Sequence, residues 1–572
     1  MSKRFKYTRN PYIDSDPIVN FRQNLQRVIN TVPADHPVYL YTKHRVDYSL
    51  TYRQFYENIR AFGTALSVLG LQGEAVAIIS ETDPCYMTAY YGTMISGGIV
   101  IPLDKDISDE EIVGFLKKAH VKAIVYGETQ NNRIGLLADQ LPEVQYFIPA
   151  YEESEQAVTD RTKPLKEFLA VGQKAVEEGN DFFETCPQDL QKCSVIIFTS
   201  GTTGTSKGVM LSQGNLVAAA NAAVDVIDQL DEHTVLLSVL PMHHTYEVTT
   251  GHLAAQFFGV TSAINDSVKY VAKNIKKYRP TYLVLVPLYV ETMHKKMWDE
   301  IRKQGKEKKV RLAMKLSNAF MALGIDLRKK FFGQILESYG GRLDAIVCGG
   351  AKLNPQCIRD FRSIGIEIQE GYGITECAPL LAANPINRNK VGSVGPAVQN
   401  VTIKIDREKP TDETGEILAK GPNVMLGYCD MPEETAAVFT EDGFFRTGDI
   451  GYTDKDGYIY ITGRKKNVII LSNGKNVFPE ELEEHLSSVP LFLESAVVGR
   501  TDSKGETVIT AVIYPDYNAL KDKTEEEIEA ILRNQLNEIN RTLPQYKQMR
   551  GLEIRKTEFE KTTSRKIKRY KI

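Results

Sequence analysis

Apolar runs of strand length alternate with helical patterns along the N-terminal part of the chain. Residues 75–80 form an uninterrupted apolar run, followed by a helical pattern over 84–96 and a second apolar run over 98–103. Continuous apolar runs are typical of strands in parallel sheets that are covered on both faces. The alternation recurs at 108–126 and at 132–148, so this region predicts a doubly wound α/β sheet.

The stretches before and after this region follow the alternation of strands and helices less closely. Residues 17–70 predict a helix, a strand at 38–41 and a second helix, whereas residues 151–192 are charged and weakly patterned, which favours an excursion over the surface. Further along, strand patterns return and predict a second α/β sheet. These strands are expected at 235–240, 282–287 and 343–348.

The pattern changes again near residue 391. Short strand patterns with the hairpin signals Asp442-Gly443 and Asp456-Gly457 predict a small β subdomain at about 391–463. Beyond it, alternating helix and strand patterns predict a small α+β domain. We therefore expect a large N-terminal domain over 1–463 and a small C-terminal domain over 464–572.

Composition limits the classes of function. The chain has 572 residues, too many for one hydrophobic core, and its 42% hydrophobic and 25% charged residues are ordinary for a globular protein. A net charge of −3 argues against broad binding to nucleic acid. The seven cysteines lack metal-ligand spacing, and we find no signal segment or apolar run of membrane-spanning length. A cytoplasmic protein is the expectation.

Residues 295–335 differ from that balanced composition. A lysine- and arginine-rich run is followed there by an amphipathic helical pattern. We interpret the segment as a solvated helical insertion. The alternative is a basic amphipathic helix that contacts the anionic surface of a membrane peripherally.

The segment 194–208 is the main candidate for chemistry. A β-branched run ends at Thr199 in a loop of glycines and hydroxyl residues, before a helix-forming segment at 211–224. Glycines allow close approach of a ligand, and hydroxyls with backbone N–H groups can surround a polyphosphate. The loop departs from the P-loop signature at Ser206 and Gly208, so an ordinary P-loop NTPase is not expected.

Other candidate residues also follow predicted strands. They lie at 241–247, 349–351 and 371–376, in addition to 199–207. In open parallel α/β sheets, ligands bind at the carboxyl ends of the strands. We therefore expect these distant segments to form one pocket.

Four segments, in this order, resemble the core motifs of the adenylate-forming superfamily. They are 198–208, 371–376, 446–449 and 463–466, and the resemblance extends over roughly 20–572. This family includes acyl-CoA synthetases, peptide-synthetase adenylation domains and luciferases. The resemblance implies a two-step reaction in which a carboxylate attacks the α-phosphorus of ATP, releasing pyrophosphate, and a thiol then displaces AMP.

The resemblance also assigns roles at the phosphates. Thr199 and Glu376 would hold Mg²⁺, a hard cation that prefers oxygen ligands. Lys566 would be the catalytic lysine, although Arg565 and Glu560 stand where the family commonly has glycine and proline. The residues around the phosphates would be Thr199, Ser200, Gly201, Thr202, Thr203, Gly204 and Lys207.

Adenosine contacts are implied in the same way. Asp449 would accept hydrogen bonds from the ribose hydroxyls, Tyr372 would stack on the base, and Arg464 would contact ribose or phosphate. Lys466 would lie at a hinge near 464–466, about which the C-terminal domain turns. The other residues of the adenosine site would be Gly349, Gly350, Ala351, Gly371, Gly373 and Thr375.

The two remaining substrates are an acid and a thiol. Segment 471–481 resembles the loop that lines the pantetheine tunnel for coenzyme A, which assigns Gly474 and Lys475 to that tunnel. Segment 240–247 is similar to the long-chain fatty-acid branch and places His244 beside the acyl carboxylate, with His243 as the alternative.

The favoured hypothesis is a long-chain fatty acid–CoA ligase that uses ATP, Mg²⁺ and coenzyme A. Within the same chemistry, the acceptor could be an acyl carrier protein, or the acid could be medium-chain or aromatic. From another class, the chain could be a non-catalytic protein that binds a nucleotide or an acyl group. The sequence leaves the acyl chain length and the oligomeric state open.

Overall fold

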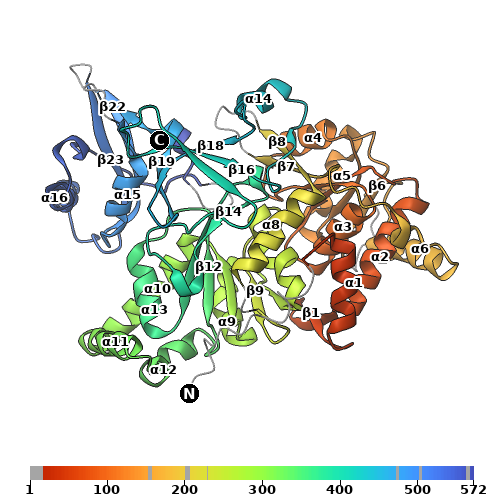
Figure 1. Ribbon diagram of the computed structural model, residues 1–572, viewed down its shortest axis with the longest axis horizontal. Coiled ribbons are helices and arrows are strands. Elements are labelled where there is room, and N and C mark those ends of the chain that lie inside the picture. The colour runs from red at the N-terminus through yellow and green to blue at the C-terminus, as the bar shows by residue number, and fades with distance from the viewer. Residues whose placement is uncertain are drawn as a thin grey trace.

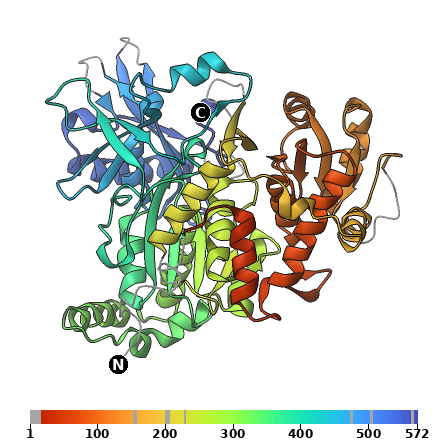
Figure 2. The same cartoon turned by 45° about the vertical axis from the view of Figure 1, so that its right-hand side comes forward.

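A large α/β body carries a smaller C-terminal body at one end. The computed structural model describes residues 17–151, 158–199, 206–227, 230–471, 476–501, 506–561 and 567–572. In Figures 1 and 2 the blue C-terminal part lies on one end of the sheets and helices built by the rest of the chain. The α/β fold with a large N-terminal domain and a smaller C-terminal domain is therefore confirmed.

Seven strands form the first large sheet, in the order β17-β8-β7-β4-β3-β5-β6. The five strands β7, β4, β3, β5 and β6 pair in parallel. At the β7 edge, β8 pairs antiparallel with β7, and β17 pairs antiparallel with β8. Every residue of β3 is buried, as expected for a strand covered on both faces. The strands are β3 (Ala75–Ile79), β4 (Ile99–Pro102), β5 (Val121–Tyr126), β6 (Tyr146–Pro149), β7 (Cys193–Thr199), β8 (Lys207–Ser212) and β17 (Gly427–Tyr428).

Helices α3 (Pro84–Ile95), α4 (Asp109–Lys118) and α5 (Asn131–Leu137) connect the parallel strands of this sheet. The start of α4 is fixed by a capping box, in which Ser108 accepts from the backbone of Glu111 and the Glu111 carboxylate accepts from the Ser108 backbone.

The surface excursion expected over 151–192 is helical in its described part. Helix α6 (Leu165–Glu177) packs on α2 (Tyr52–Val68), and α7 (Phe182–Thr185) follows it. Phe168 is fully buried, and a Cβ at Gly172 would lie 1.8 Å from the Ala61 carbonyl oxygen, so the two helices touch through the glycine. Leu165, Phe168 and Gly172 lie on the buried face of α6, and most of the charged residues of this helix lie on its other side.

Eight strands form the second large sheet, in the order β14-β13-β12-β11-β9-β10-β1-β2. Neighbours from β1 to β13 pair in parallel, while the edge strands β2 and β14 are antiparallel. The strands are β1 (Pro37–Lys43), β2 (Val46–Thr51), β9 (Val235–Ser238), β10 (Thr261–Ile264), β11 (Tyr282–Leu285), β12 (Ala345–Cys348), β13 (Glu367–Gly373) and β14 (Leu380–Ala383).

Strand β2 is an addition to the expected helix–strand–helix at 17–70. It forms a hairpin with β1 through His44 and Arg45, both of which have positive φ. Most of its side chains are exposed, so β2 lacks the apolar signal of the buried strands.

Helices lie around the second sheet (Figure 1). The segment 295–335 is helical, as expected, and it belongs to a series of helices that begins directly after β11. The helices of this half are α1 (Phe21–Thr31), α8 (Gln213–Val226), α9 (Val271–Tyr278), α10 (Pro287–Lys303), α11 (Glu307–Ala322), α12 (Arg328–Ser338) and α13 (Pro355–Ile364), with a π-helix at Glu247–Ala254.

A four-stranded antiparallel sheet, β15-β16-β18-β19, follows the two large sheets. Its strands are β15 (Thr402–Asp406), β16 (Gly415–Lys420), β18 (Phe445–Thr453) and β19 (Ile459–Arg464), and α14 (Pro432–Ala437) precedes β18. Asp456-Gly457 forms the turn between β18 and β19, with Gly457 at positive φ. Through β19 this sheet leads into the C-terminal domain.

The C-terminal domain has its own hydrophobic core, which includes Leu482, Leu532 and Ile513. Its main sheet has the order β22-β23-β24, and β20 pairs with β21. The elements are β20 (Ile469–Ile470), β21 (Asn476–Val477), α15 (Pro479–Ser487), β22 (Phe492–Thr501), β23 (Thr507–Pro515), α16 (Glu525–Thr542) and β24 (Gly551–Ile554).

Among the described residues, none of the helices combines the length and the apolar character needed to cross a membrane.

Candidate active site

The strand and the helix expected around the polyphosphate segment (194–208) are present as β7 and α8, and a second strand that was not expected, β8, lies between them. Thr199 at the end of β7 pairs with Lys207 at the start of β8, and α8 begins only after β8 ends. Gly208 lies so close to β7 that a Cβ would sit 3.0 Å from Ile196 and 3.1 Å from Phe198. Five predicted residues, Ser200, Gly201, Thr202, Thr203 and Gly204, lie outside the described residues.

Tyr428 joins two of the predicted residues. The Lys207 ammonium nitrogen lies 4.6 Å from the centre of the Tyr428 ring, and the Tyr428 hydroxyl donates to Glu376 Oε1 over 3.1 Å. Burial, followed by the nearby Glu376 charge, raises the pKa of Tyr428. The segment is held in place because β17 pairs with β8 and the Met425 N–H donates to the Glu376 carbonyl. Tyr428 was not predicted from the sequence, since its only signal is an aromatic residue in a short apolar run.

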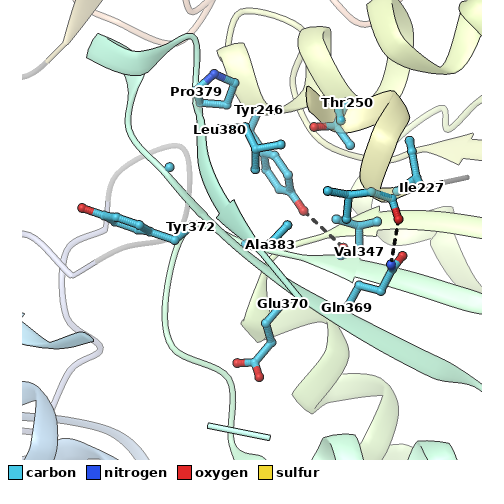
Figure 3. A pocket seen from close by; sticks show the side chains of 16 residues that line it. Ile227, Tyr246, Thr250, Val347, Gln369, Glu370, Tyr372, Pro379, Leu380 and Ala383 are labelled. Atoms are coloured by element: carbon cyan, nitrogen blue, oxygen red, sulfur yellow. Dashed lines mark hydrogen bonds between the residues drawn. The ribbon is translucent and has the colours of Figure 1, made fainter. Parts of the chain in front are cut away.

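An apolar pocket lies between α8, the π-helix and strands β12–β14 (Figure 3). It contains about 590 Å³ of space not filled by atoms, part of it open to solvent. Tyr246 and Thr250 from the π-helix side face Leu380, whereas Glu370 points away from them. The lining residues include Ala223, Val226, Ile227, Val347, Pro379 and Ala383.

Tyr246 determines the shape of the pocket at the carboxyl end of β12. Its hydroxyl lies 3.2 Å from the Val347 carbonyl oxygen and 3.3 Å from that of Leu285, and it donates to this edge of the sheet (Figure 3). A Cβ at Gly349 would lie 3.3 Å from the Tyr246 ring, and Gly350 has a φ of +86°. Glycine therefore fits both positions, one for close packing and the other for its backbone conformation.

The structure brings several predicted adenosine residues to the same edge. Gly371 and Gly373 lie on β13 and line the pocket together with Gly349 and Gly350. Ala351 is exposed directly after them, and Thr375 lies in the turn that follows β13.

Tyr372 and Asp449 come from different sheets and meet through a hydrogen bond. The Tyr372 hydroxyl donates to Asp449 Oδ2 over 2.7 Å, and Arg464 Nε lies 2.7 Å from Asp449 Oδ1. Arg464 stands opposite Asp449 in the pairing of β18 with β19, which fixes this contact. Burial and the Asp449 charge raise the pKa of Tyr372, so the phenol stays neutral. The arrangement gives one buried carboxylate two donors, next to the glycine-lined end of the pocket.

His243 and His244 lie beyond the carboxyl end of β9. Their rings are 4.1 Å apart, and His243 Nε2 lies 3.7 Å from Asp104 Oδ2, a residue that follows β4 of the other large sheet. Burial lowers the pKa of His243 to about 4, so this ring is neutral near pH 7. The site thus lies where the two large sheets approach each other, and Asp104 is a neighbour that the sequence analysis missed because nothing in its surroundings indicates the contact.

Residues 464–467 connect β19 to the C-terminal domain through several polar contacts. Lys465 pairs with Glu416 of β16, and the Asn467 amide donates to Glu480 of α15. Lys466 is exposed, and partial desolvation followed by the Arg464 charge lowers the pKa of its ammonium group. The short linker is therefore held from both sides.

Two further contacts place the C-terminal domain. Lys352, which follows Ala351, pairs with Glu484 of α15. Lys561 pairs with Glu494 and forms a β-bridge with Ile567, so Lys561 and Ile567 both lie on this domain. Lys566 itself, like Gly474 and Lys475, lies outside the described residues.

Models of known families match most of the chain. The model of the AMP-binding enzyme family matches residues 25–429, and that of the AMP-binding enzyme C-terminal domain matches residues 481–566. The chain belongs to the AMP-binding enzyme family. The resemblance inferred from the four motifs is thereby confirmed, and with it the expectation of an AMP-forming ligase.

The sequence identity of the chain to several relatives is 25–28%. A long-chain-fatty-acid–CoA ligase, FadD15 of Mycobacterium bovis, is 28% identical over 84% of this chain and 81% of its own. A chloroplast long-chain-fatty-acid–[acyl-carrier-protein] ligase of Arabidopsis thaliana, AEE15, is 27% identical over 83% and 73%. The ATP-bound structure of MatB from Rhodopseudomonas palustris is 25% identical, with a TM-score of 0.71 over 96% of this chain and 98% of MatB.

The residues proposed for Mg²⁺ suit that ion as far as their chemistry goes. Thr199 and Glu376 supply a hydroxyl and a carboxylate, and both lie beside the Lys207–Tyr428 pair. Within the described ranges, no group of three or more His, Cys, Asp or Glu side chains could hold a metal. Mg²⁺ in nucleotide enzymes commonly uses one or two protein oxygens and takes its other ligands from phosphates and water. The two oxygen ligands from Thr199 and Glu376 therefore match the number that proteins commonly supply to Mg²⁺ at such sites.

Proposed function

We propose that this protein is a long-chain fatty acid–CoA ligase. It would join a fatty acid to AMP and then transfer the acyl group to coenzyme A as a thioester. The observation that carries the proposal is the apolar pocket, whose glycine-lined end adjoins the Tyr372–Asp449 pair. A pocket with apolar walls and a few polar groups at one end suits a hydrocarbon chain with a carboxylate at its head. Relatives named as long-chain ligases support the same choice.

In the first step a carboxylate oxygen attacks the α-phosphorus of ATP, the bond from this phosphorus to the bridging oxygen breaks, and pyrophosphate leaves. Two anions meet, so the site must supply positive charge and hydrogen-bond donors. Lys207 brings a cation to the start of β8, and its contact with Tyr428 fixes the direction of the side chain. Lys566 would bring a second cation from the C-terminal domain.

Mg²⁺, when bound, would neutralise part of the phosphate charge, and Thr199 with Glu376 would be its protein ligands. Tyr428 donates to Glu376 and so orients this carboxylate.

Adenosine would bind at the edge formed by β12 and β13. Asp449 has two carboxylate oxygens and can accept from both ribose hydroxyls, in exchange for or beside its present donors. Gly349, Gly350 and Ala351 would line the base, and Tyr372 would stack on it. The glycines leave room for a flat ring next to Tyr246.

In the second step the thiol sulfur of coenzyme A attacks the acyl carbonyl carbon, the bond to AMP breaks, and the thiol proton is lost to solvent or a base. The proposal keeps 1–463 and 464–572 as the two domains, with a hinge at 464–466. Rotation there would bring the loop with Gly474 and Lys475 to the pocket as the pantetheine tunnel. A few residues can absorb such a change.

Pyrophosphate release over a panel of acids from four to eighteen carbons tests the proposal. Release should require an acid, rise with chain length, and yield acyl-CoA when coenzyme A is added. Each methylene buried in an apolar pocket contributes about 0.8 kcal/mol, so kcat/KM should rise about fourfold per carbon until the pocket is full. No acid-dependent release from any acid would refute the ligase and favour a non-catalytic binding protein.

An acyl carrier protein is the second candidate acceptor, because one relative bears that name. Equal concentrations of coenzyme A and of a carrier protein with its phosphopantetheine, each offered with the preferred acid, separate the two. Thioester formation on the carrier alone would replace coenzyme A in the proposal and leave the first step unchanged.

A further inference from the structure

The outer face of α11 and the start of α12 is apolar and positively charged. Five large apolar side chains are exposed in this short stretch, out of fifteen in the described part of the chain. We call them and the exposed lysines beside them the α11–α12 patch. Its apolar members are Leu312 (59% exposed), Leu316 (47%), Leu323 (75%), Ile325 (47%) and Phe331 (39%), and its lysines are Lys308, Lys309, Lys315, Lys329 and Lys330.

The opposite face of α11 is already used by the fold. Met314 and Ser317 are buried against the second sheet's helices, and the Asn318 amide donates to Ser363 of α13. Leu312 and Leu316 are one turn apart on the other side of the helix, so the fold does not need them for its core. The Phe320 and Phe331 rings lie 6.5 Å apart, which joins the end of α11 to the start of α12.

Charge on this segment is strongly positive. Residues 306–331 contain eight lysines and arginines and two acidic residues, in a chain whose net charge is −3. Both acidic residues are engaged in ion pairs, Glu307 with Arg311 and Asp326 with Arg328. The exposed lysines therefore keep their positive field toward solvent.

We propose that the α11–α12 patch docks on the surface of an anionic lipid bilayer. Apolar side chains flanked by lysines are the composition of helices that lie in a membrane interface, where the chains enter the headgroup region and the cations meet anionic lipids. Protein interfaces, in contrast, are depleted in lysine. A second copy of this chain would bring two positive patches together, and like charges oppose such contact.

The position of the patch suits this role. Helix α10 starts next to the pocket, where Val286 lies beside Gly350, and its seventeen residues carry the chain about 25 Å away to α11. In Figures 1 and 2, α11 and α12 lie at the lower edge of the molecule and the C-terminal domain lies above them, at the upper left. A docked molecule would keep that domain clear of the membrane. The functional consequence, access to a fatty acid held in the bilayer, rests on the proposed function; the docking itself does not.

Co-sedimentation of the full chain with vesicles tests the inference. Vesicles of phosphatidylcholine alone are compared with vesicles that also contain phosphatidylglycerol, at low and high salt. We expect binding only to the anionic vesicles and weaker binding at high salt. Neutralising a lysine should weaken binding about fivefold, on the basis of the attraction of one lysine to an anionic surface.

Control substitutions at exposed residues elsewhere distinguish an effect of the α11–α12 patch from an effect of changing any exposed side chain. Leu323→Gln in the patch is paired with Leu136→Gln, since Leu136 is 80% exposed on α5. A triple Lys→Gln variant at Lys308, Lys309 and Lys315 is paired with one at the exposed lysines Lys166, Lys455 and Lys521. Only the patch variants should lose vesicle binding. Equal binding by patch and control variants, or no binding of the wild type to either vesicle, would overturn the proposal.

Two further measurements distinguish lipid docking from dimerisation and from a failure of the proposed ligase function. Light scattering after gel filtration would reveal a dimer that Leu323→Gln abolishes, and that result would assign the face to a second copy instead. Pyrophosphate release with detergent-dispersed acid should be the same in patch and control variants. Lack of this activity in the wild type and in every variant, with vesicle binding lost only in the patch variants, would refute the ligase function and leave the docking surface standing.

Discussion

Glu247 should make the protein less stable as the pH rises, and Glu247→Gln should remove that effect. Glu247 is fully buried on the π-helix; Ser238 donates to its Oε1, and its Oε2 has no hydrogen-bond partner among the described residues. Burial raises its pKa to about 8. His252 lies 3.8 Å away, but burial lowers its pKa to about 3, so near neutral pH the two groups are neutral rather than an ion pair.

The magnitude follows from the two pKa values of Glu247. The ordinary value is 4.5, so between pH 4.5 and about 8 the folded protein keeps a proton that the unfolded chain has lost. Stability is full below 4.5 and falls with rising pH until the folded group also ionises. The slope is about 1.4 kcal/mol per pH unit, which amounts to roughly 3 kcal/mol between pH 5 and pH 7. Glutamine cannot ionise and lacks this slope.

The assay is the midpoint of the first thermal unfolding transition at several pH values from 5 to 9. The wild-type midpoint should fall by several degrees more than that of Glu247→Gln over this range. His252 titrates in the other direction, because its loss of stability comes below pH 6.5, and it affects both proteins equally. Glu178→Gln, at an exposed glutamate, is the control. Parallel curves for Glu247→Gln and wild type would refute the reasoning.

Three further substitutions test the site. Tyr428→Phe removes the hydrogen bond to Glu376 and keeps the ring, so pyrophosphate release should fall about tenfold with an unchanged unfolding midpoint. Asp449→Asn weakens the proposed ribose contact, and ATP affinity by calorimetry should fall about 10- to 100-fold. Lys352→Glu should alter the ratio of the two half-reaction rates by up to about fivefold, and the added Glu484→Lys should restore it; a swap without rescue would exclude this pair.

The buried strands and the C-terminal elements were predictable from the sequence because their patterns are local. Strand β3 is apolar at every position, and α16 carries a capping box from Thr524 to Glu527 before an amphipathic repeat. Strand β2 was not predictable in this way, since its exposed, polar residues pair with β1 without any apolar signal. Helix α6 is amphipathic, but its close contact with α2 through Gly172 has no counterpart in the local sequence.

The candidate residues were predictable as a group, and their partners were not. The rule that ligands bind at the carboxyl ends of strands placed Gly349 and Tyr372 at one edge, and the structure has them there. Tyr428 reaches Glu376 only because β17 pairs with β8, and the register of that pairing has no counterpart in the local sequence. A motif can therefore indicate which residues act on a ligand, whereas the contacts that orient them depend on the tertiary fold.

The contact between Asp104 and His243 is an example of a contact at the site that depends on the tertiary fold and cannot be predicted from the local sequence. Each residue follows the carboxyl end of a strand, Asp104 after β4 and His243 after β9, but the strands belong to different sheets. The approach of the two sheets buries His243 and lowers its pKa to about 4. Its ring is therefore neutral near pH 7, and in the role proposed for His244, with His243 as the alternative, it would donate one hydrogen bond to a substrate carboxylate without adding charge. The positive charge that adenylation needs would then come from the proposed Mg²⁺ and from lysines, for which Lys207 and Lys566 are the proposed residues.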